Sequence, residues 1–158
     1  DNSIRYTDNF LARIIHLLKQ QQVDASMLYT SDHGEDIFDD GRHLFLHASP
    51  VPSYYQLHVP LLLWTSDSYR EEYPGIEKAA SMNRQKNISS SISFFQTMME
   101  LAGIETPYRN DSLSVTSPLY TEKSRVYLND HNEPHSLDDI GMRKEDFEML
   151  KKRGIDAQ

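Results

Sequence analysis

The hydrophobic pattern of the first thirty residues predicts a helix followed by a strand. Apolar side chains recur every three or four residues between positions 4 and 18, which is the spacing of one helix face. The residues on this face are Ile4, Leu11, Ile14, Ile15 and Leu18. We therefore expect a helix over residues 4–22 and, from the short apolar run that follows, a buried strand over residues 25–30.

Four later stretches extend this pattern. They are a strand over residues 58–65, a helix over 87–102, a short strand over 124–129 and an exposed final helix over 142–153. Pro60 indicates that the second strand begins at a sheet edge or irregularly, because proline cannot donate a ladder hydrogen bond. Gly103 and Gly154 stand directly after the two later helices, where a residue in the left-handed conformation commonly ends a helix.

Alternating helices and strands are typical of an α/β domain with a mostly parallel sheet flanked by helices. In such sheets ligands bind at the carboxyl ends of strands. The sequence SDHGED begins at Ser31, directly after the first predicted strand. Asp32 and His33 are therefore expected at the edge of the sheet where a site would form.

An aspartate carboxylate and a neutral imidazole are common ligands of zinc and other divalent metals. Gly34 permits a sharp backbone turn that would let Asp32 and His33 reach one ion. The alternative is purely structural: Asp32 would cap a helix that begins near Gly34, and His33 would be an exposed side chain. On the dipeptide alone, the structural alternative is the better supported of the two.

Two features of the following loop favour the metal site. Acidic residues crowd within six positions, which repels them from one another unless water or a cation offsets the charge. They are Glu35, Asp36, Asp39 and Asp40, and their spacing does not match an EF-hand loop. His47, in a loop returning toward the next strand, could donate to an anionic oxygen.

Composition narrows the class of protein. A chain of 158 residues, 38% hydrophobic and 25% charged, suits one globular domain. The net charge of −8 argues against a nucleic-acid partner, which would require a basic surface. The sequence has no cysteine, so disulfides and thiolate metal sites are excluded. It also has no apolar run long enough for a membrane span and no signal peptide, and we interpret it as a mature product or a piece of a longer protein.

Several stretches together resemble one family. They are SDHGED, FLHASP, YYQLHVPLLLW and NISSSISFFQTMMELAGI. The chain is similar, from its first residues to about residue 130, to the C-terminal part of bacterial phosphoethanolamine transferases, which belong to the sulfatase/alkaline phosphatase-like superfamily. The resemblance implies an alkaline phosphatase-like fold that is incomplete, with residues 1–158 forming the C-terminal portion of the catalytic domain.

The resemblance also implies roles for individual residues. Asp32 and His33 match metal ligands of the family, with zinc or another divalent metal as the cofactor. His47 matches a histidine that binds the phosphoryl group and is the catalytic residue we expect in this chain. His43, in the same loop, is the rival for that role, since the loop is longer than usual and Ala48 replaces a common glycine. His58, at the beginning of a strand, is interpreted as structural.

The function implied is metal-dependent transfer of phosphoethanolamine from phosphatidylethanolamine to an envelope glycolipid such as lipid A. A threonine nucleophile, a further acidic metal ligand and the membrane helices match nothing in this sequence. The parent enzyme is accordingly expected in the inner membrane, with this domain facing the periplasm. The chain alone is expected to be inactive, to bind zinc weakly and to self-associate. A sulfatase, a phosphoglycerol transferase and a non-catalytic domain of the same fold remain alternatives.

Overall fold

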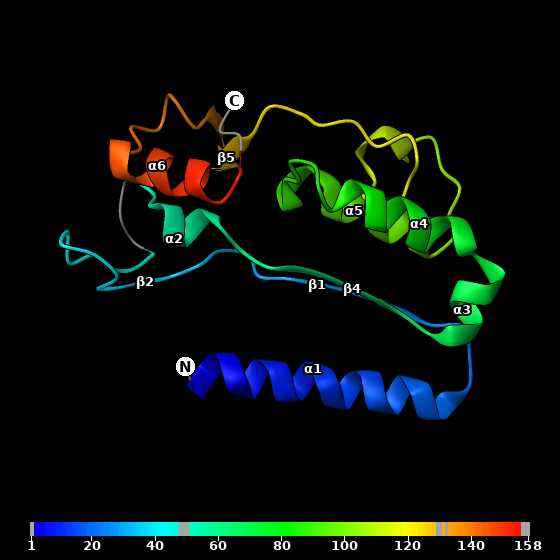
Figure 1. The fold of residues 1–158 in the computed structure, drawn as a ribbon. Coiled ribbons are helices and arrows are strands. Elements are labelled where there is room, and N and C mark those ends of the chain that lie inside the picture. The colour runs from blue at the N-terminus through cyan, green and yellow to red at the C-terminus, as the bar shows by residue number, and fades with distance from the viewer. Residues whose placement is uncertain (1, 48–50, 129–130, 132, 156–158) are drawn as a thin grey trace.

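The computed structural model describes residues 2–47, 51–128, 131 and 133–155 (Figure 1). Its helices are α1 (Asn2–Gln21), α2 (Tyr54–Leu57), α3 (Asp67–Glu72), α4 (Pro74–Asn83), α5 (Ser90–Leu101), the 3-10 helix η1 (Asp111–Leu113) and α6 (Lys144–Lys152). Its strands are β1 (Ser26–Thr30), β2 (Asp36–Ile37), β3 (Phe45–Leu46), β4 (Leu61–Thr65), β5 (Val126–Leu128) and β6 (Pro134–Ser136). Over these residues, no helix has both the length and the apolar character needed to cross a membrane.

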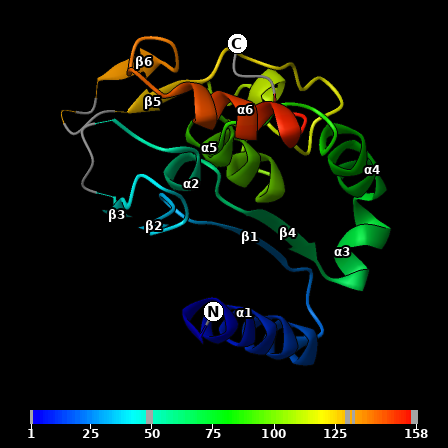
Figure 2. The same cartoon turned by 60° about the vertical axis from the view of Figure 1, so that its left-hand side comes forward.

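The β1–β4 pair is the centre of the fold. Its register runs from Ser26 opposite Thr65 to Thr30 opposite Leu61. Helix α1 lies along one face of the pair, and α5 lies on the other side (Figures 1 and 2). A ribbon pair covered by helices on both faces confirms the α/β class.

The direction of strand pairing differs from the expectation of a mostly parallel sheet. All three pairs in the described part of the chain, β1–β4, β2–β3 and β5–β6, are antiparallel. The reason is the path after β1: β2 and α2 lie at the end where β1 finishes, and the chain enters β4 from that same end (Figure 1). A parallel neighbour would need a crossover back to the beginning of β1. This return path gathers the predicted site residues at one end of the pair.

Most predicted elements are confirmed, with shifted ends. The helices predicted over 4–22 and 87–102 correspond to α1 and α5, and the strands over 25–30 and 58–65 correspond to β1 and β4. Strand β4 begins directly after Pro60. This is consistent with proline having no N–H group to donate to a neighbouring strand. Gly103 and Gly154 have φ of 62° and 71°, so both adopt the left-handed conformation at the helix ends. The strand predicted over 124–129 is β5, and Asn129 lies outside the described residues.

The final helix is not the exposed element that the sequence predicted. Asp146 and Leu150 of α6 are only 1% and 5% exposed, and being four positions apart they lie on one face of the helix. Leu150 joins Tyr54, Leu137 and Met142 in a buried cluster between α2 and α6. The many charged residues of α6 occupy its other faces, which is why its composition suggested exposure.

The link between β4 and α5 contains two helices that the hydrophobic pattern did not predict. Ser66 caps α3 by accepting a hydrogen bond from the Tyr69 N–H group at 3.2 Å. Pro74 occupies the first turn of α4, where its missing N–H group costs nothing. The signals for α3 and α4 are thus residues at the helix ends and not a repeating apolar pattern. Helix α3 is also too short to show such a repeat.

Candidate functional site

The segment SDHGE leaves β1 and passes closely over α2. The Gly34 N–H group donates to the Gln56 carbonyl at 2.8 Å. A Cβ atom on Gly34 would collide with the Tyr55 carbonyl oxygen. Gly34 is not among the glycines with positive φ, so the sequence-based reason for this glycine was incomplete: the position requires space rather than a left-handed turn. The contact with α2 holds the residues on either side of Gly34 against the fold.

The His33 ring is oriented by the backbone. Its Nδ1 atom lies 3.0 Å from the Gly34 carbonyl oxygen. Since a carbonyl can only accept, this hydrogen bond requires the proton on Nδ1 and leaves the lone pair on Nε2. The Nε2 atom faces Asp32, whose Oδ2 lies 3.7 Å away. Ser31 supports the same turn by donating from its hydroxyl to the His33 carbonyl at 2.7 Å.

Asp32 and His33 therefore lie together at the carboxyl end of β1. The Asp32 side chain is 87% exposed, and its Oδ1 accepts the His33 N–H group at 3.0 Å. This hydrogen bond, and to a lesser extent the electrostatic interaction with the His33 ring, hold the pKa of Asp32 below its usual value. The carboxylate is thus kept ionised, which is the form that binds a cation.

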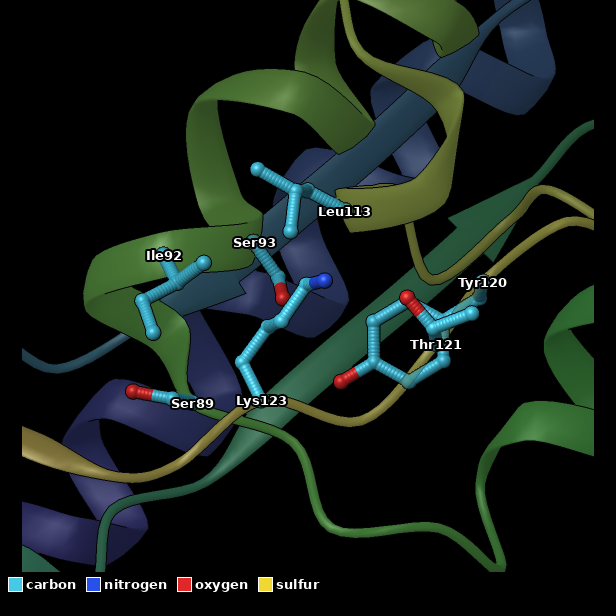
Figure 3. A pocket seen from close by; sticks show the side chains of 7 residues that line it. All are labelled: Ser89, Ile92, Ser93, Leu113, Tyr120, Thr121 and Lys123. Carbon is cyan, nitrogen blue, oxygen red and sulfur yellow. The ribbon is translucent and has the colours of Figure 1, made fainter.

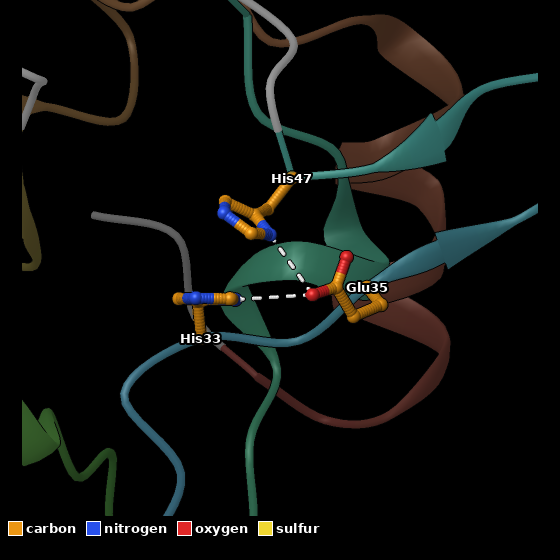
Figure 4. Close-up of side chains that lie close together, drawn as sticks. All are labelled: His33, Glu35 and His47. Carbon is orange, nitrogen blue, oxygen red and sulfur yellow. Dashed lines mark hydrogen bonds and ion pairs between the residues drawn. The ribbon is translucent and has the colours of Figure 1, made fainter.

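His47 reaches the same place from the other end of the loop. Its ring centroid lies 4.0 Å from that of His33, and the two planes are tilted by 38°. Its Nδ1 atom lies 2.8 Å from Oε1 of Glu35, which is also 3.9 Å from Nδ1 of His33 (Figure 4). The β2–β3 pair makes this meeting possible, because it folds the loop back on itself.

Glu35 is the residue of this site whose role sequence reasoning missed. It was counted only among the crowded acids. A signal was present, because side chains two positions apart in an extended segment point to the same side, and Glu35 stands two positions after His33. His33, Glu35 and His47 each offer one ligand atom, and these atoms lie within 4.8 Å of one another. Two imidazoles and a carboxylate form a donor set that suits zinc.

The other two candidate histidines lie elsewhere. His43 is exposed with φ of 54°, its N–H group donates to the Asp40 carbonyl, and it does not belong to the group around Glu35. His58 stacks on Tyr54 with its Nδ1 atom 2.8 Å from the Tyr54 hydroxyl. Desolvation lowers the pKa of His58, and the positive charges of Arg153 and Arg125 lower it further. These contacts favour the structural interpretation of His58.

Two other acids of the loop, Asp36 and Asp40, accept hydrogen bonds from side chains of the protein. Asp36 is only 2% exposed and accepts hydrogen bonds from the Ser53 hydroxyl, at 2.7 Å, and from the Gln56 amide. Asp40 accepts from Nε of Arg42 at 2.9 Å, and hydrogen bonds from Arg42 lower the pKa of Asp40. The acidic crowding is therefore relieved without a metal, and it is not by itself evidence for one.

A small hollow at the beginning of α5 offers no second site. It lies between α5 and the segment that follows η1, and its own side chains fill it (Figure 3). They are Ser89, Ile92, Ser93, Leu113, Tyr120, Thr121 and Lys123.

The sequence matches known proteins of one family. The family model Sulfatase matches residues 1–104. Phosphoethanolamine transferase EptA of Salmonella typhimurium is 32% identical over 123 residues, which are 75% of this chain and 22% of that protein. Phosphoethanolamine transferase EptC of Escherichia coli is 26% identical over 139 residues, 87% of this chain and 23% of that protein. The chain thus spans less than a quarter of the length of these two relatives.

Solved structures resemble the fold over most of the described chain. The C-terminal periplasmic domain of EptC from Escherichia coli, in a complex with Zn, superposes with a TM-score of 0.72 at 25% identity and covers 89% of this chain and 39% of that one. The soluble domain of lipooligosaccharide phosphoethanolamine transferase A from Neisseria meningitidis has a TM-score of 0.63 at 22% identity, covering 72% and 35%. This agreement confirms the alkaline phosphatase-like α/β class. With a family model matching residues 1–104, the chain belongs to the sulfatase family, and within it is similar to phosphoethanolamine transferases.

Proposed function

We propose that this chain is the C-terminal portion of the catalytic domain of a metal-dependent transferase. The parent enzyme would move phosphoethanolamine from phosphatidylethanolamine to an envelope glycolipid such as lipid A. The observation that carries the proposal is the convergence of His33, Glu35 and His47 at the carboxyl end of β1. Relatives named phosphoethanolamine transferase EptA and Kdo(2)-lipid A phosphoethanolamine 7''-transferase support the kind of reaction.

Asp32 and His33 are the proposed metal ligands, through the Asp32 carboxylate and Nε2 of His33. The hydrogen bond from Nδ1 of His33 to the Gly34 carbonyl supports this choice of ligand atom. Zinc is the proposed metal because the donors are nitrogen and oxygen and because the EptC neighbour is a Zn complex. A bound zinc would act as a Lewis acid and activate a hydroxyl nucleophile. The nucleophile and the remaining ligands would come from residues outside this sequence.

His47 is the proposed ligand of the phosphoryl group, with Glu35 as its positioning residue. A carboxylate only accepts, so the 2.8 Å contact directs the Nδ1 proton of His47 toward Glu35. With a proton on both ring nitrogens, His47 would donate from its Nε2–H group to a phosphoryl oxygen. Asp32 and His33 would thus hold the metal, while His47 stabilises charge on the transferred group.

The parent enzyme is proposed to lie in the inner membrane with this domain in the periplasm. The name of the EptC neighbour, a C-terminal periplasmic domain, supports that side of the membrane. Membrane attachment would come from segments outside this sequence.

Apolar side chains that are exposed on α1 support self-association of the isolated chain. Ile4 and Tyr6 are 72% and 76% exposed, and Phe10 and Leu17 are more than half exposed. Sedimentation of the purified chain as a monomer at all concentrations would rule this out.

Expression of the parent enzyme in a bacterium that lacks such activity tests the function. Mass spectrometry of its lipid A should show addition of one phosphoethanolamine unit, and the Asp32→Ala enzyme should add none. Addition of phosphoglycerol, or release of sulfate from a sulfate ester, would assign the parent to a different reaction of the same family.

The Glu35→Gln variant separates the two roles that Glu35 can have. If Glu35 only positions His47, zinc affinity is retained while the transfer rate falls. Loss of zinc affinity together with activity would instead make Glu35 a metal ligand and contradict the proposed division of roles.

A further inference from the structure

A groove of about 630 Å³ adjoins the candidate site. Four parts of the chain form its walls: the segment before β4, the link between α4 and α5, strand β5 and the end of α6. Asp32 and His33 also line the groove. A molecule bound at the candidate site would therefore have direct access to the groove.

The charge of the groove is opposite to that of the chain. The chain has 24 acidic and 16 basic residues. The described residues that line the groove include only one acid, Asp32, and four cations: Arg84, Lys86, Arg125 and Arg153. Such a local reversal of charge concentrates anions where the rest of the surface repels them.

Uncharged partners hold two of these cations in place. Arg125 donates to the Ile88 carbonyl at 3.0 Å and to the Asn87 side-chain oxygen at 3.2 Å. Lys86 donates to the Tyr120 carbonyl at 2.9 Å. The Tyr120 carbonyl carries no formal charge, so this contact positions Lys86 without cancelling its charge.

Arg84 and Arg153 have exposed side chains within the groove. The positive field is also visible at His58, another lining residue. Desolvation is the main reason that the pKa of His58 is lowered, and the charges of Arg153 and Arg125 add to it. The guanidinium groups of Arg153 and Arg125 thus act on one region of the groove.

The groove has apolar walls as well. The apolar lining residues come from the segment before β4, the first position of β4, strand β5 and the residues after α6. They include Val59, Leu61, Val126 and Ile155. A small inorganic anion would leave these side chains uncovered. A ligand with both anionic and apolar parts would satisfy both kinds of wall.

We propose that this groove binds a second phosphate of an amphiphilic acceptor, beyond the group that reacts, and that Arg84 and Arg153 determine this specificity. The proposal rests on the proposed function, since it assigns the groove to the acceptor of the transfer reaction. It makes the enzyme selective for acceptors that carry additional negative charge next to an apolar portion.

Binding of dihexanoyl phosphatidic acid to the purified chain, measured by isothermal titration calorimetry with EDTA present, tests the proposal. The Arg84→Gln/Arg153→Gln variant should bind about tenfold more weakly, as expected for the loss of two exposed ionic contacts. The matched control is Arg5→Gln/Arg13→Gln, which removes two exposed charges from α1, outside the groove. The control should bind as the unmodified chain does. Inorganic phosphate and neutral dihexanoylglycerol should both bind more weakly than the phosphatidic acid.

Equal binding by the Arg84→Gln/Arg153→Gln variant would overturn the specificity role. Equal binding of inorganic phosphate or of dihexanoylglycerol would overturn the combined anionic and apolar recognition. Circular dichroism spectra of the variants establish that they are folded. The assay involves neither metal nor transfer, so its result is independent of whether the parent enzyme transfers phosphoethanolamine.

Discussion

Arg42 and Asp146 lie 104 positions apart and form a two-pronged ion pair, with nitrogen–oxygen distances of 2.7 and 2.9 Å. Asp146 is only 1% exposed and also accepts the Tyr54 N–H group at 2.8 Å. Arg42 stands in the loop that connects Glu35 with His47. One carboxylate of α6 therefore fixes the site loop and the beginning of α2 together.

Replacing Asp146 with Asn should destabilise the protein by about 2 kcal/mol, because it removes the charge from a buried acceptor of hydrogen bonds from Arg42 and the Tyr54 N–H group. Arg42 is only 12% exposed and keeps its pair with Asp40, so its charge loses one of two carboxylate partners. Denaturant unfolding measures the change in free energy. The loosened loop should also weaken zinc binding at the site.

Glu148→Gln on the same helix is the matched control. The Glu148 side chain is 65% exposed and pairs with Lys144 at 3.5 Å, so its loss should cost less than about 1 kcal/mol. Equal destabilisation by both variants would show that the Arg42–Asp146 pair has no special importance.

Gly34→Ala should destabilise the protein by roughly 1–3 kcal/mol, because the new methyl group meets the Tyr55 carbonyl oxygen and the backbone must move. Gly41→Ala is the control: it lies in the same loop, has no atom within 4 Å of the added Cβ and does not have positive φ. Thermal unfolding of both variants measures the difference. An unchanged melting temperature for Gly34→Ala would mean that the SDHGE segment does not lie against α2 as described.

The elements predicted from the sequence were those with a long apolar period or a clear end signal. Helix α5 has both and α1 has the apolar period, and the boundaries of the two helices are nearly as predicted. The direction of the β1–β4 pair was not predictable in this way, because alternating helices and strands do not specify where a loop returns. Likewise, the burial of Asp146 depends on Arg42, and no local pattern relates residues so far apart.

The candidate site was predictable in part for the same reason. Asp32 and His33 directly follow a strand, and ligands of α/β sheets bind at the carboxyl ends of strands. The choice of His47 over His43 as the neighbour of His33 depends on the β2–β3 turn. Two-residue strands are too short to show alternation, so the sequence left both histidines open.

The chain should bind zinc weakly, and the binding should require His33. Zinc sites use at least three protein ligands, and the two proposed in this chain are Asp32 and His33. His33→Ala should lower the zinc affinity at least about tenfold. His43→Ala is the control, since His43 lies outside the group around Glu35. Competition with a fluorescent zinc indicator measures both affinities, and a similar loss in the two variants would contradict the assignment.

The stability of the fold should fall as the pH drops below about 6.5, in part because of His58. Desolvation, and to a lesser extent the charges of Arg153 and Arg125, lower the pKa of His58 below the 6.5 of a free histidine. The unfolded chain therefore binds a proton at His58 more readily than the folded chain does. Neutral His58 makes its full contribution to the free energy of unfolding above the pKa of the unfolded state. This contribution is lost as the pH falls through the pKa of the folded state. Unfolding free energies of the unmodified chain and of His58→Gln, measured between pH 5 and 8, should differ most at high pH.

The Arg153→Gln variant tests whether the charge of Arg153 contributes to the lowered pKa of His58. Removing this charge should raise the pKa of His58 toward its usual value, since Arg153 is the larger of the two charge effects. The pH dependence that His58 contributes should then become weaker, although Arg153 is exposed and salt will screen part of the effect. Double variants of His58 and Arg153, compared with the single variants at each pH, isolate this coupling. A coupling free energy that does not change with pH would show that Arg153 acts on the fold by a route other than the charge of His58.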